Sequence, residues 1–214
     1  MHIVKASRDS LLKPLQIVSG VVERKQTMPI LANVLIQKEG EQVSFTATDL
    51  EIQIKTQASI GQDAQNVSTT VSARKLVDIL RALPEADVSL SLASKRLTVQ
   101  SGKSRFNLQT LAAEEYPTIA KAQFDSELTL PAASLKYLLH MVHFSMAAQD
   151  IRYYLNGMLL VIENDTVRAV ATDGHRLALC QLNEIKTDSI KVDGRVEAII
   201  PRKTILELSH LLPD

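Results

Sequence analysis

Three residues with reactive side chains, Asp173, His175 and Arg176, stand within four positions of one another in the run at 171–177. A carboxylate and an imidazole two residues apart can belong to a hydrolytic or acid–base site. Such a site also needs a nucleophile, and the sequence contains no Gly-x-Ser-x-Gly motif. The single cysteine, Cys180, lies in an apolar strand-like run, which is typical of a buried small hydrophobe. We therefore do not expect an enzyme.

A metal site is a second alternative, because His140 and His143 lie on one predicted helix. His175 or Asp173 would have to complete the ligand set. This spacing is loose, and the region has no cysteine pair of the kind that many zinc sites use. We expect neither a metal nor another cofactor.

The run Thr172-Asp173 has an earlier counterpart in Thr48-Asp49, and from Thr48 to Thr172 is 124 positions. At the same offset Val43 pairs with Val167, Leu31 with Leu155, and Leu35 with Leu159, without a gap back to the preceding predicted helix. A gapless match of this length indicates one folding unit used twice. The shared Thr-Asp pair is then a turn element, in which Asp173 caps the turn. Residues 174–176, where the repeats differ, are better candidates for function.

The elements that position these residues follow one order, a strand, a helix and three strands, which predicts an α+β fold built from repeated β-α-β-β-β units. We expect helices at 8–19, 72–83, 134–145 and 201–212. The first helix is predicted to begin at a Ser10 cap and the fourth at Pro201. Strands are expected at 1–6, 33–38, 43–48, 51–57, 67–71, 88–92, 96–100, 105–110, 128–130, 155–162, 167–171, 175–182 and 196–200. A linker over 113–126 then separates a domain at 1–120 from one at 127–214, and we expect the second domain to lack its last strands.

The composition of the 214 residues, 45% hydrophobic and 22% charged, is typical of a globular protein with a buried core. We find no apolar run of the roughly 20 residues that a membrane span needs and no signal peptide, so we expect a cytoplasmic protein without a membrane partner. The formal net charge is zero. The predicted helices nevertheless carry eight cationic side chains against three acidic ones. Such a basic helical surface can attract an anion on one side of the molecule.

Several runs together resemble the family of bacterial sliding clamps, the beta subunits of DNA polymerase III. They are the runs at 144–158 and 171–177, together with Leu11-Leu12-Lys13-Pro14-Leu15, Met28-Pro29-Ile30-Leu31 and Thr48-Asp49-Leu50-Glu51. The resemblance covers essentially the whole chain. It implies DNA-clamp domains with helices on one face and antiparallel sheets on the other, and a homodimeric ring of six domains around double-stranded DNA.

The resemblance also implies two groups of binding residues. The lining of the ring would contact DNA weakly and without sequence readout, and the family's DNA contacts would correspond here to Arg24, Lys25, Arg74, Gln149, Tyr153 and Tyr154. A groove would take short linear peptides of the replicative polymerase, the clamp loader and repair proteins. Its residues would be Leu155, Thr172, Gly174, His175, Arg176 and Leu177.

Simpler interpretations of these residues stay open. The basic residues can be ordinary solvated side chains, and Tyr153 with Tyr154 can be a half-buried aromatic pair. The repeats can also form a structural oligomeric scaffold without DNA. That alternative explains the repetition, but it does not explain why the positive charge gathers on the predicted helices.

Overall fold

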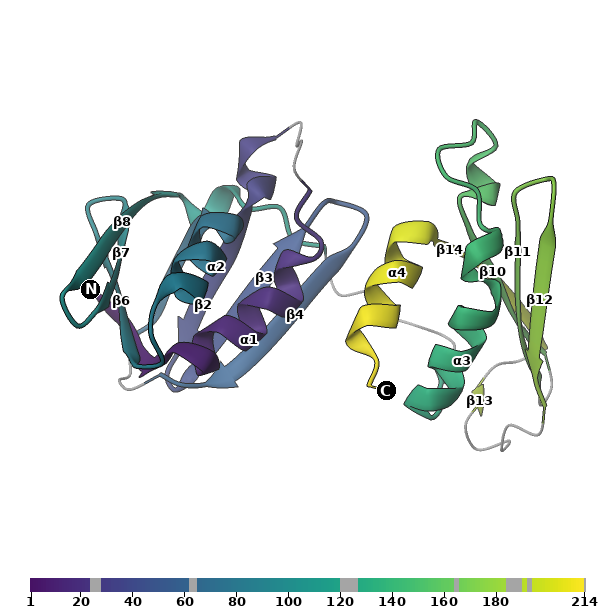
Figure 1. The fold of residues 1–214 in the computed structure, drawn as a ribbon, viewed down its shortest axis with the longest axis horizontal. Helices are drawn as coiled ribbons and strands as arrows, with labels where there is room; N and C mark the ends of the chain where they lie inside the picture. Colours follow the sequence, from purple (N-terminus) through teal and green to yellow (C-terminus); the bar gives the residue numbers. More distant parts are fainter. Residues whose placement is uncertain are drawn as a thin grey trace. The chain divides into compact units, whose positions relative to one another are not determined.

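The computed structural model describes residues 1–23, 28–61, 65–119, 127–163, 166–183, 190–191 and 194–213. The chain folds as two compact units, Met1–Ala120 and Lys121–Asp214 (Figure 1). Two of the expected DNA-contact residues, Arg24 and Lys25, lie outside the described residues.

The first unit contains the predicted order twice. Its elements are β1 (His2–Ser7), α1 (Arg8–Ser19), β2 (Asn33–Glu39), β3 (Gln42–Thr48), β4 (Gln53–Ser59), β5 (Val67–Ser72), α2 (Ala73–Ala82), β6 (Asp87–Ala93), β7 (Arg96–Ser101) and β8 (Ser104–Leu111), with short 3₁₀ turns at Pro29–Ala32 and Ala113–Glu115. The eight strands form one sheet of order β1-β6-β7-β8-β5-β2-β3-β4. All of its strand pairs are antiparallel, as the family resemblance implies.

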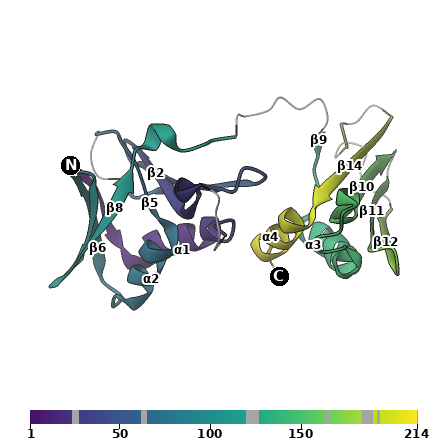
Figure 2. The same ribbon diagram turned by 90° about the horizontal axis from the view of Figure 1, so that it is seen from above.

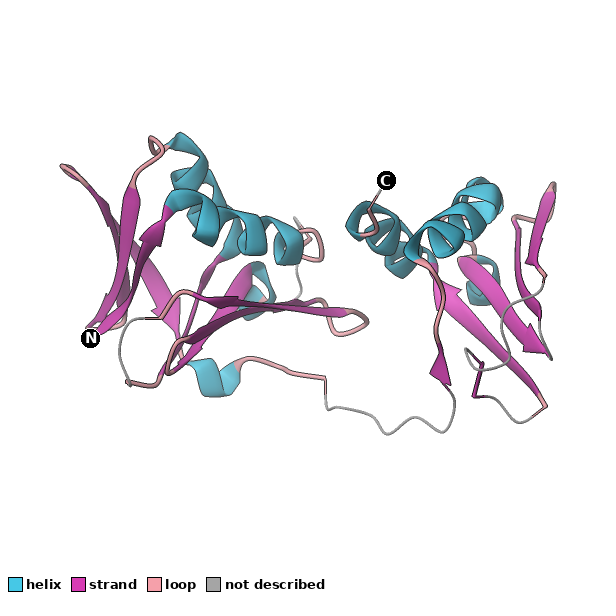
Figure 3. Cartoon of the chain, turned by 90° about the horizontal axis from the view of Figure 1, so that it is seen from below, coloured by secondary structure: helices cyan, strands magenta, loops and turns pink. Residues whose placement is uncertain are grey.

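The helices α1 and α2 lie side by side and cover one face of this sheet (Figures 1 and 3). Leu11, Leu15 and Val18 are the buried residues of α1, and their spacing places them on one helical face. Leu76 and Leu80 are likewise buried on one face of α2. Burying a leucine stabilises a fold by about 1.5–3 kcal/mol, so these stripes fix both helices on the sheet.

The second unit contains the order of one strand, one helix and three strands once, and then begins it again with a strand and a helix. Its elements are β9 (Glu127–Leu128), α3 (Ala132–Val142), 3₁₀ turns at His143–Ser145 and Tyr153–Leu155, β10 (Gly157–Glu163), β11 (Thr166–Thr172), β12 (Leu177–Leu182), β13 (Ile190–Lys191), β14 (Arg195–Pro201) and α4 (Arg202–Leu211). The main sheet has the order β12-β11-β10-β14, and β13 pairs with β9. Figure 2 shows α3 and α4 beside each other, and Leu138, Leu139 and Ile205 pack into the core below them.

The repeat found in the sequence extends to the pairing of individual residues. In the first unit Leu35 lies opposite Thr46, and 124 positions later Leu159 lies opposite Val170. A one-residue slip would turn every side chain to the other face of the sheet, so equal registers mean equal buried faces. The gapless offset therefore marks a structural repeat, as predicted.

Some predicted caps and element boundaries are wrong. The predicted bounds of the first helix, 8–19, are confirmed, but its cap is Ser7, whose hydroxyl accepts from the Ser10 backbone N–H, and not Ser10. Pro201 ends β14 as the N-cap residue of α4, and the helix begins at Arg202. The α-helix of 134–145 ends at Val142 and continues as a 3₁₀ turn.

Three expected strands start two residues later than predicted. The strands of 51–57, 155–162 and 175–182 begin at Gln53, Gly157 and Leu177. In each case the residues in front of the strand belong to a hydrogen-bonded turn. None of the helices in the described part of the chain is both long and apolar enough to cross a membrane.

Candidate partner and DNA contact sites

The turn between β3 and β4, residues 48–52, is held by two side chains. The Thr48 hydroxyl donates to the Ile52 carbonyl at 2.7 Å and accepts from the Leu50 N–H at 3.0 Å. The Asp49 Oδ1 atom accepts from the N–H groups of Glu51 and Ile52 at 3.0 and 2.8 Å. We call this segment the first turn.

The second turn, residues 172–176 between β11 and β12, repeats each of these bonds. The Thr172 hydroxyl donates to the Arg176 carbonyl at 2.7 Å and accepts from the Gly174 N–H at 3.1 Å. The Asp173 Oδ1 atom accepts from the N–H groups of His175 and Arg176 at 2.9 and 3.0 Å. The Thr-Asp pair is therefore structural in both repeats, and the capping role predicted for Asp173 is confirmed.

The third residue of each turn has a positive φ angle, 81° at Leu50 and 88° at Gly174. This region favours glycine, because a side chain there is sterically strained. A Cβ atom at Gly174 would also meet the Arg152 guanidinium at 3.2 Å. Glycine at this position thus both relieves strain and leaves room for Arg152.

The two turns differ most in what covers them. In the first unit Tyr116 is buried, and its hydroxyl accepts from the Thr48 N–H at 3.2 Å and donates to the Asn33 carbonyl at 3.1 Å. Burial raises the pKa of Tyr116 to about 12, because the charged phenolate would lose its water. Thr48 is consequently 0% exposed. All four residues at 174–177 are exposed in the second unit, whereas at the corresponding positions of the first unit only Leu50 and Glu51 are exposed.

Charged side chains line the second turn. The Arg176 Nε atom donates to Asp173 at 2.9 Å, and the Arg176 guanidinium lies 5.8 Å from the centre of the Phe144 ring. The backbone N–H groups of His175 and Arg176, helped by the Arg176 side chain, lower the pKa of Asp173 to about 2. The carboxylate is therefore ionised at neutral pH and fixes one edge of the Arg176 guanidinium, while Phe144 packs against the cation.

A second ion pair reaches the same turn from the segment before β10. Arg152 donates to both oxygens of Asp150, at 3.0 and 2.9 Å, and these bonds lower the pKa of Asp150 to about 2. The Arg152 carbonyl accepts from the Leu155 N–H at 2.9 Å. Because the Arg152 guanidinium also lies beside Gly174, one residue connects Leu155 with the second turn.

The apolar part of the site has one buried and one exposed leucine. Leu155 is 8% exposed, and its carbonyl accepts from the Ala147 N–H at 3.0 Å. Leu177 is 65% exposed at the start of β12. The six groove residues expected from the sequence therefore all belong to the second unit, with four of them on the second turn and Leu177 directly after it.

Sequence reasoning missed three residues at this site: Phe144, Asp150 and Arg152. All three lie in the run at 144–158 that carries the resemblance. The Asp-x-Arg spacing of 150–152 was the available signal, because two residues across a tight turn can form a local ion pair. The contact between Phe144 and Arg176 joins segments 32 positions apart and had no local signal.

The expected DNA contacts that the structure describes are exposed. Arg74 projects from α2, and Gln149 adopts a positive φ of 60°. Tyr153 is 82% exposed and meets Tyr154 edge to face with the ring centres 5.8 Å apart. Tyr153 and Tyr154 are thus a surface pair, and the half-buried alternative does not describe Tyr153.

Some of the positive charge on the helices is engaged within the fold. Arg8 pairs with Asp9 and Glu85, and the Arg202 guanidinium donates to the Met146 carbonyl at 3.1 Å. Lys13 and Arg74 are exposed. The described residues contain no group of three His, Cys, Asp or Glu side chains that could hold a metal ion.

Residues 2–120 match the N-terminal domain of the DNA polymerase III beta subunit, and residues 129–214 match the central domain of the same subunit. The chain belongs to the DNA polymerase III beta subunit family. Its α+β fold of helices and antiparallel sheets is the fold of the solved beta subunits.

Individual beta subunits are similar over nearly all of the chain. The beta sliding clamp of Pseudomonas putida is 46% identical over 100% of the chain, and that of Escherichia coli K12 is 44% identical over 96%. The crystal structure of the beta subunit from Pseudomonas aeruginosa superposes with a TM-score of 0.91 at 43% identity, covering 100% of the chain and 57% of that subunit. The chain spans 57% of the Pseudomonas putida clamp and 55% of the Escherichia coli clamp.

Proposed function

We propose that this chain is part of a sliding clamp, a processivity factor that encircles duplex DNA and tethers the replicative polymerase. The clamp acts in the bacterial cytoplasm as a homodimeric ring, and it has no catalytic step of its own. Residues 1–120 and 127–214 are its first two clamp domains. The observation that carries the proposal is that the two domains match, in this order, the N-terminal and the central domain of the beta subunit.

The distribution of charge in the chain supports a ring that encloses duplex DNA. A ring holds DNA by topology, so its inner surface needs only weak, salt-sensitive attraction to phosphates. The modest excess of cationic side chains on the helices, Arg74 among them, would provide such attraction. Arg24, Lys25, Gln149, Tyr153 and Tyr154 are the other proposed contacts. These contacts carry no base readout, which leaves the clamp free to slide over any sequence.

The second turn is the proposed docking site for short peptides of the polymerase, the clamp loader and repair proteins. Leu155 and Leu177 provide apolar contact area, and Thr172, Gly174, His175 and Arg176 form a polar rim. The first turn has the same hydrogen bonds, but Tyr116 covers Thr48, and Leu50 and Glu51 stand where the second turn has Gly174 and His175.

The test uses the full-length natural protein and two forms of one plasmid, closed circular and linear. After loading by the clamp loader and a wash in high salt, the clamp should stay on the circle and leave the linear form within minutes. Linearising a loaded circle should release it. Equal retention on both forms would favour ordinary electrostatic binding, and no retention on either would favour the structural scaffold.

A further inference from the structure

The side chain of Asn156 closes the segment in front of β10 into a loop. Its Oδ1 atom accepts from the Asp150 N–H at 2.9 Å, and its Nδ2 atom donates to the Asp150 carbonyl at 2.8 Å. A planar amide can do both at once through two different atoms, whereas a carboxylate can only accept. The side chain of Asn156 therefore pairs with both backbone groups of Asp150. We call residues 146–156 the anchored loop.

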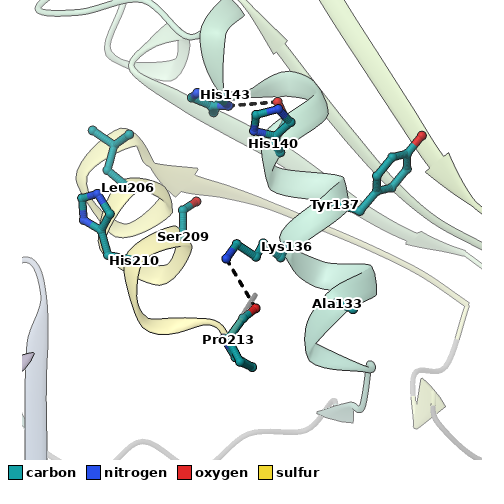
Figure 4. Close-up of a pocket in the computed structure, with 9 residues that line it drawn as sticks. All are labelled: Ala133, Lys136, Tyr137, His140, His143, Leu206, Ser209, His210 and Pro213. Atoms are coloured by element: carbon teal, nitrogen blue, oxygen red, sulfur yellow. Dashed lines mark hydrogen bonds between the residues drawn. The ribbon is translucent and has the colours of Figure 1, made fainter.

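The backbone of Asn156 ties the anchored loop to α4. Its carbonyl accepts from the Arg202 N–H at 2.9 Å, and the Arg202 guanidinium donates to the Met146 carbonyl at 3.1 Å. The helix α4 is itself fixed beside α3, because Lys136 of α3 donates to the Pro213 carbonyl at 3.4 Å (Figure 4). The anchored loop is thus held at both of its ends from within the second unit.

A chain of contacts leads from Asn156 to the second turn. Asp150, held by both of its backbone groups, accepts from the Nε and Nη2 atoms of Arg152 at 3.0 and 2.9 Å. The Arg152 guanidinium lies 3.2 Å from where a Cβ atom at Gly174 would be, and the Arg152 carbonyl accepts from the Leu155 N–H at 2.9 Å. Two of the proposed groove residues therefore have their surroundings set by contacts that begin at Asn156.

The amide of Asn156 is better protected from water than the ion pair that follows it. The side chains of Arg152 and Asp150 are 49% and 22% exposed, and an ion pair as accessible as this one stabilises a loop only weakly. Asn156 is half-buried, and both of its side-chain bonds to Asp150 are partly buried. Water therefore replaces these bonds less readily. We assign the fixed shape of the anchored loop to Asn156 more than to the ion pair.

The repeat shows that this side chain is not a general requirement of the fold. The residue 124 positions before Asn156 is Ala32, in the 3₁₀ turn Pro29–Ala32 of the first unit. An alanine side chain has no polar atom, so the first unit forms the corresponding segment without such bonds. The amide is present only in the unit that carries the proposed docking site.

We infer that Asn156 is a positioning residue for peptide docking, which preorganises the anchored loop so that Arg152 and Leu155 are in place before a peptide arrives. The inference rests on the proposed function of the second turn. A loop that must first become ordered costs conformational entropy on binding, and preorganisation removes that cost. This role requires no contact between Asn156 and the peptide.

The test replaces the amide by a group of the same shape in the full-length protein. In Asn156→Asp the carboxylate can still accept from the Asp150 N–H, but its second oxygen faces the Asp150 carbonyl, which also only accepts. We expect the variant to bind a polymerase-derived peptide about three- to tenfold more weakly in calorimetry, through a less favourable entropy. The Arg152 Nε–H, which Asp150 binds in the wild type, should exchange faster with water in NMR spectra.

Asn33→Asp is the matched control, because it makes the same chemical change in the first unit. The Asn33 Nδ2 atom donates to the Thr70 hydroxyl at 3.0 Å, and both residues are buried. This variant should lose stability in the first unit. It should nevertheless bind the peptide like the wild type and leave the exchange of the Arg152 Nε–H unchanged.

The outcomes separate this inference from the proposed function. If peptide affinity and Arg152 exchange are unchanged in Asn156→Asp, the positioning role is overturned and the docking site stands. If the wild type binds no peptide, the docking site itself is wrong and the inference falls with it. Equal weakening in Asn33→Asp would show a general loss of stability and would also overturn the inference. Should Asn156→Asp not fold, Asn156→Ser, whose short hydroxyl cannot span both Asp150 groups, must weaken binding to the same extent.

Discussion

At the scale of single residues, the Thr-Asp pair builds the same turn twice. The two threonines make equivalent bonds, but Thr48 is fully buried beneath Tyr116 while Thr172 is partly exposed. A polar group that loses its partner in a buried place cannot bond to water instead. The same substitution should therefore have different effects in the two repeats.

Replacement of each threonine by valine tests this difference, because valine keeps the shape and removes the hydroxyl. We expect Thr48→Val to lower the free energy of unfolding of the first unit by about 1–3 kcal/mol. Thr172→Val should cost the second unit only about 0.5–1 kcal/mol, since water can replace the lost bonds. Urea unfolding followed by amide exchange, which reports each unit separately, measures both values. Equal losses would contradict the burial argument.

Tyr116 gives a prediction that depends on pH. Its pKa is about 12 in the folded chain and close to 10 when unfolded. The folded pKa is the higher one, so the stabilisation is complete below pH 10 and is lost as the pH rises from 10 to 12. Tyr116→Phe should be less stable by about 1–3 kcal/mol at pH 7, because the Thr48 N–H and the Asn33 carbonyl lose their partner.

The measurement for Tyr116 is the denaturation midpoint of both proteins between pH 7 and pH 12. The wild type should lose stability more steeply than Tyr116→Phe above pH 10, so the two curves converge. Parallel curves over this range would show that the phenol does not titrate in the way its burial requires.

At the scale of elements, the third residue of the first turn fits its positive φ angle less well than the third residue of the second turn. Leu50 has a positive φ of 81° with a half-exposed side chain, whereas Gly174 is the residue that this geometry favours. A strained residue of this kind costs about 1–3 kcal/mol, part of which glycine's larger backbone entropy offsets. The first turn is therefore slightly strained and the second is not.

The exchange of these residues should have opposite effects. We expect Leu50→Gly to stabilise the first unit by up to about 1 kcal/mol, and Gly174→Leu to destabilise the second by about 1–2 kcal/mol. The new Cβ atom would also displace Arg152. Thermal unfolding of the two variants measures the effect, and a loss of stability in Leu50→Gly would show that its side chain packs better than its exposure indicates.

The order of the elements could be predicted from the sequence because it depends on local periodicity and on the repeat. The cap at Ser7 and the helix beginning at Arg202 could not, because several neighbouring residues can serve as a cap and tertiary contacts select one. The strands after both turns were predicted to begin too early, since the same Thr-Asp pairs that mark the turn also bind the next three or four residues.

At the scale of the whole molecule, the same repeat unit with its Thr-Asp turn occurs twice in different surroundings. The resemblance predicted the groove residues, and all of them belong to the second unit. The contact that covers Thr48 in the first turn joins it to Tyr116, which lies 68 positions away in the sequence. No local pattern predicts such a contact. It explains why Thr48 is buried in the first turn while Thr172 is partly exposed in the second.

The most direct test of this account is the affinity of the full-length protein for a polymerase-derived peptide, measured by calorimetry. Arg176→Ala and His175→Ala should each weaken binding by about tenfold or more, in line with the loss of a central polar contact. The matched control Glu51→Ala, at the position of the first turn that corresponds to His175, should bind like the wild type. If the control weakens binding as much as the second-turn variants, or if all three bind equally well, the assignment of the open turn as the partner site is wrong.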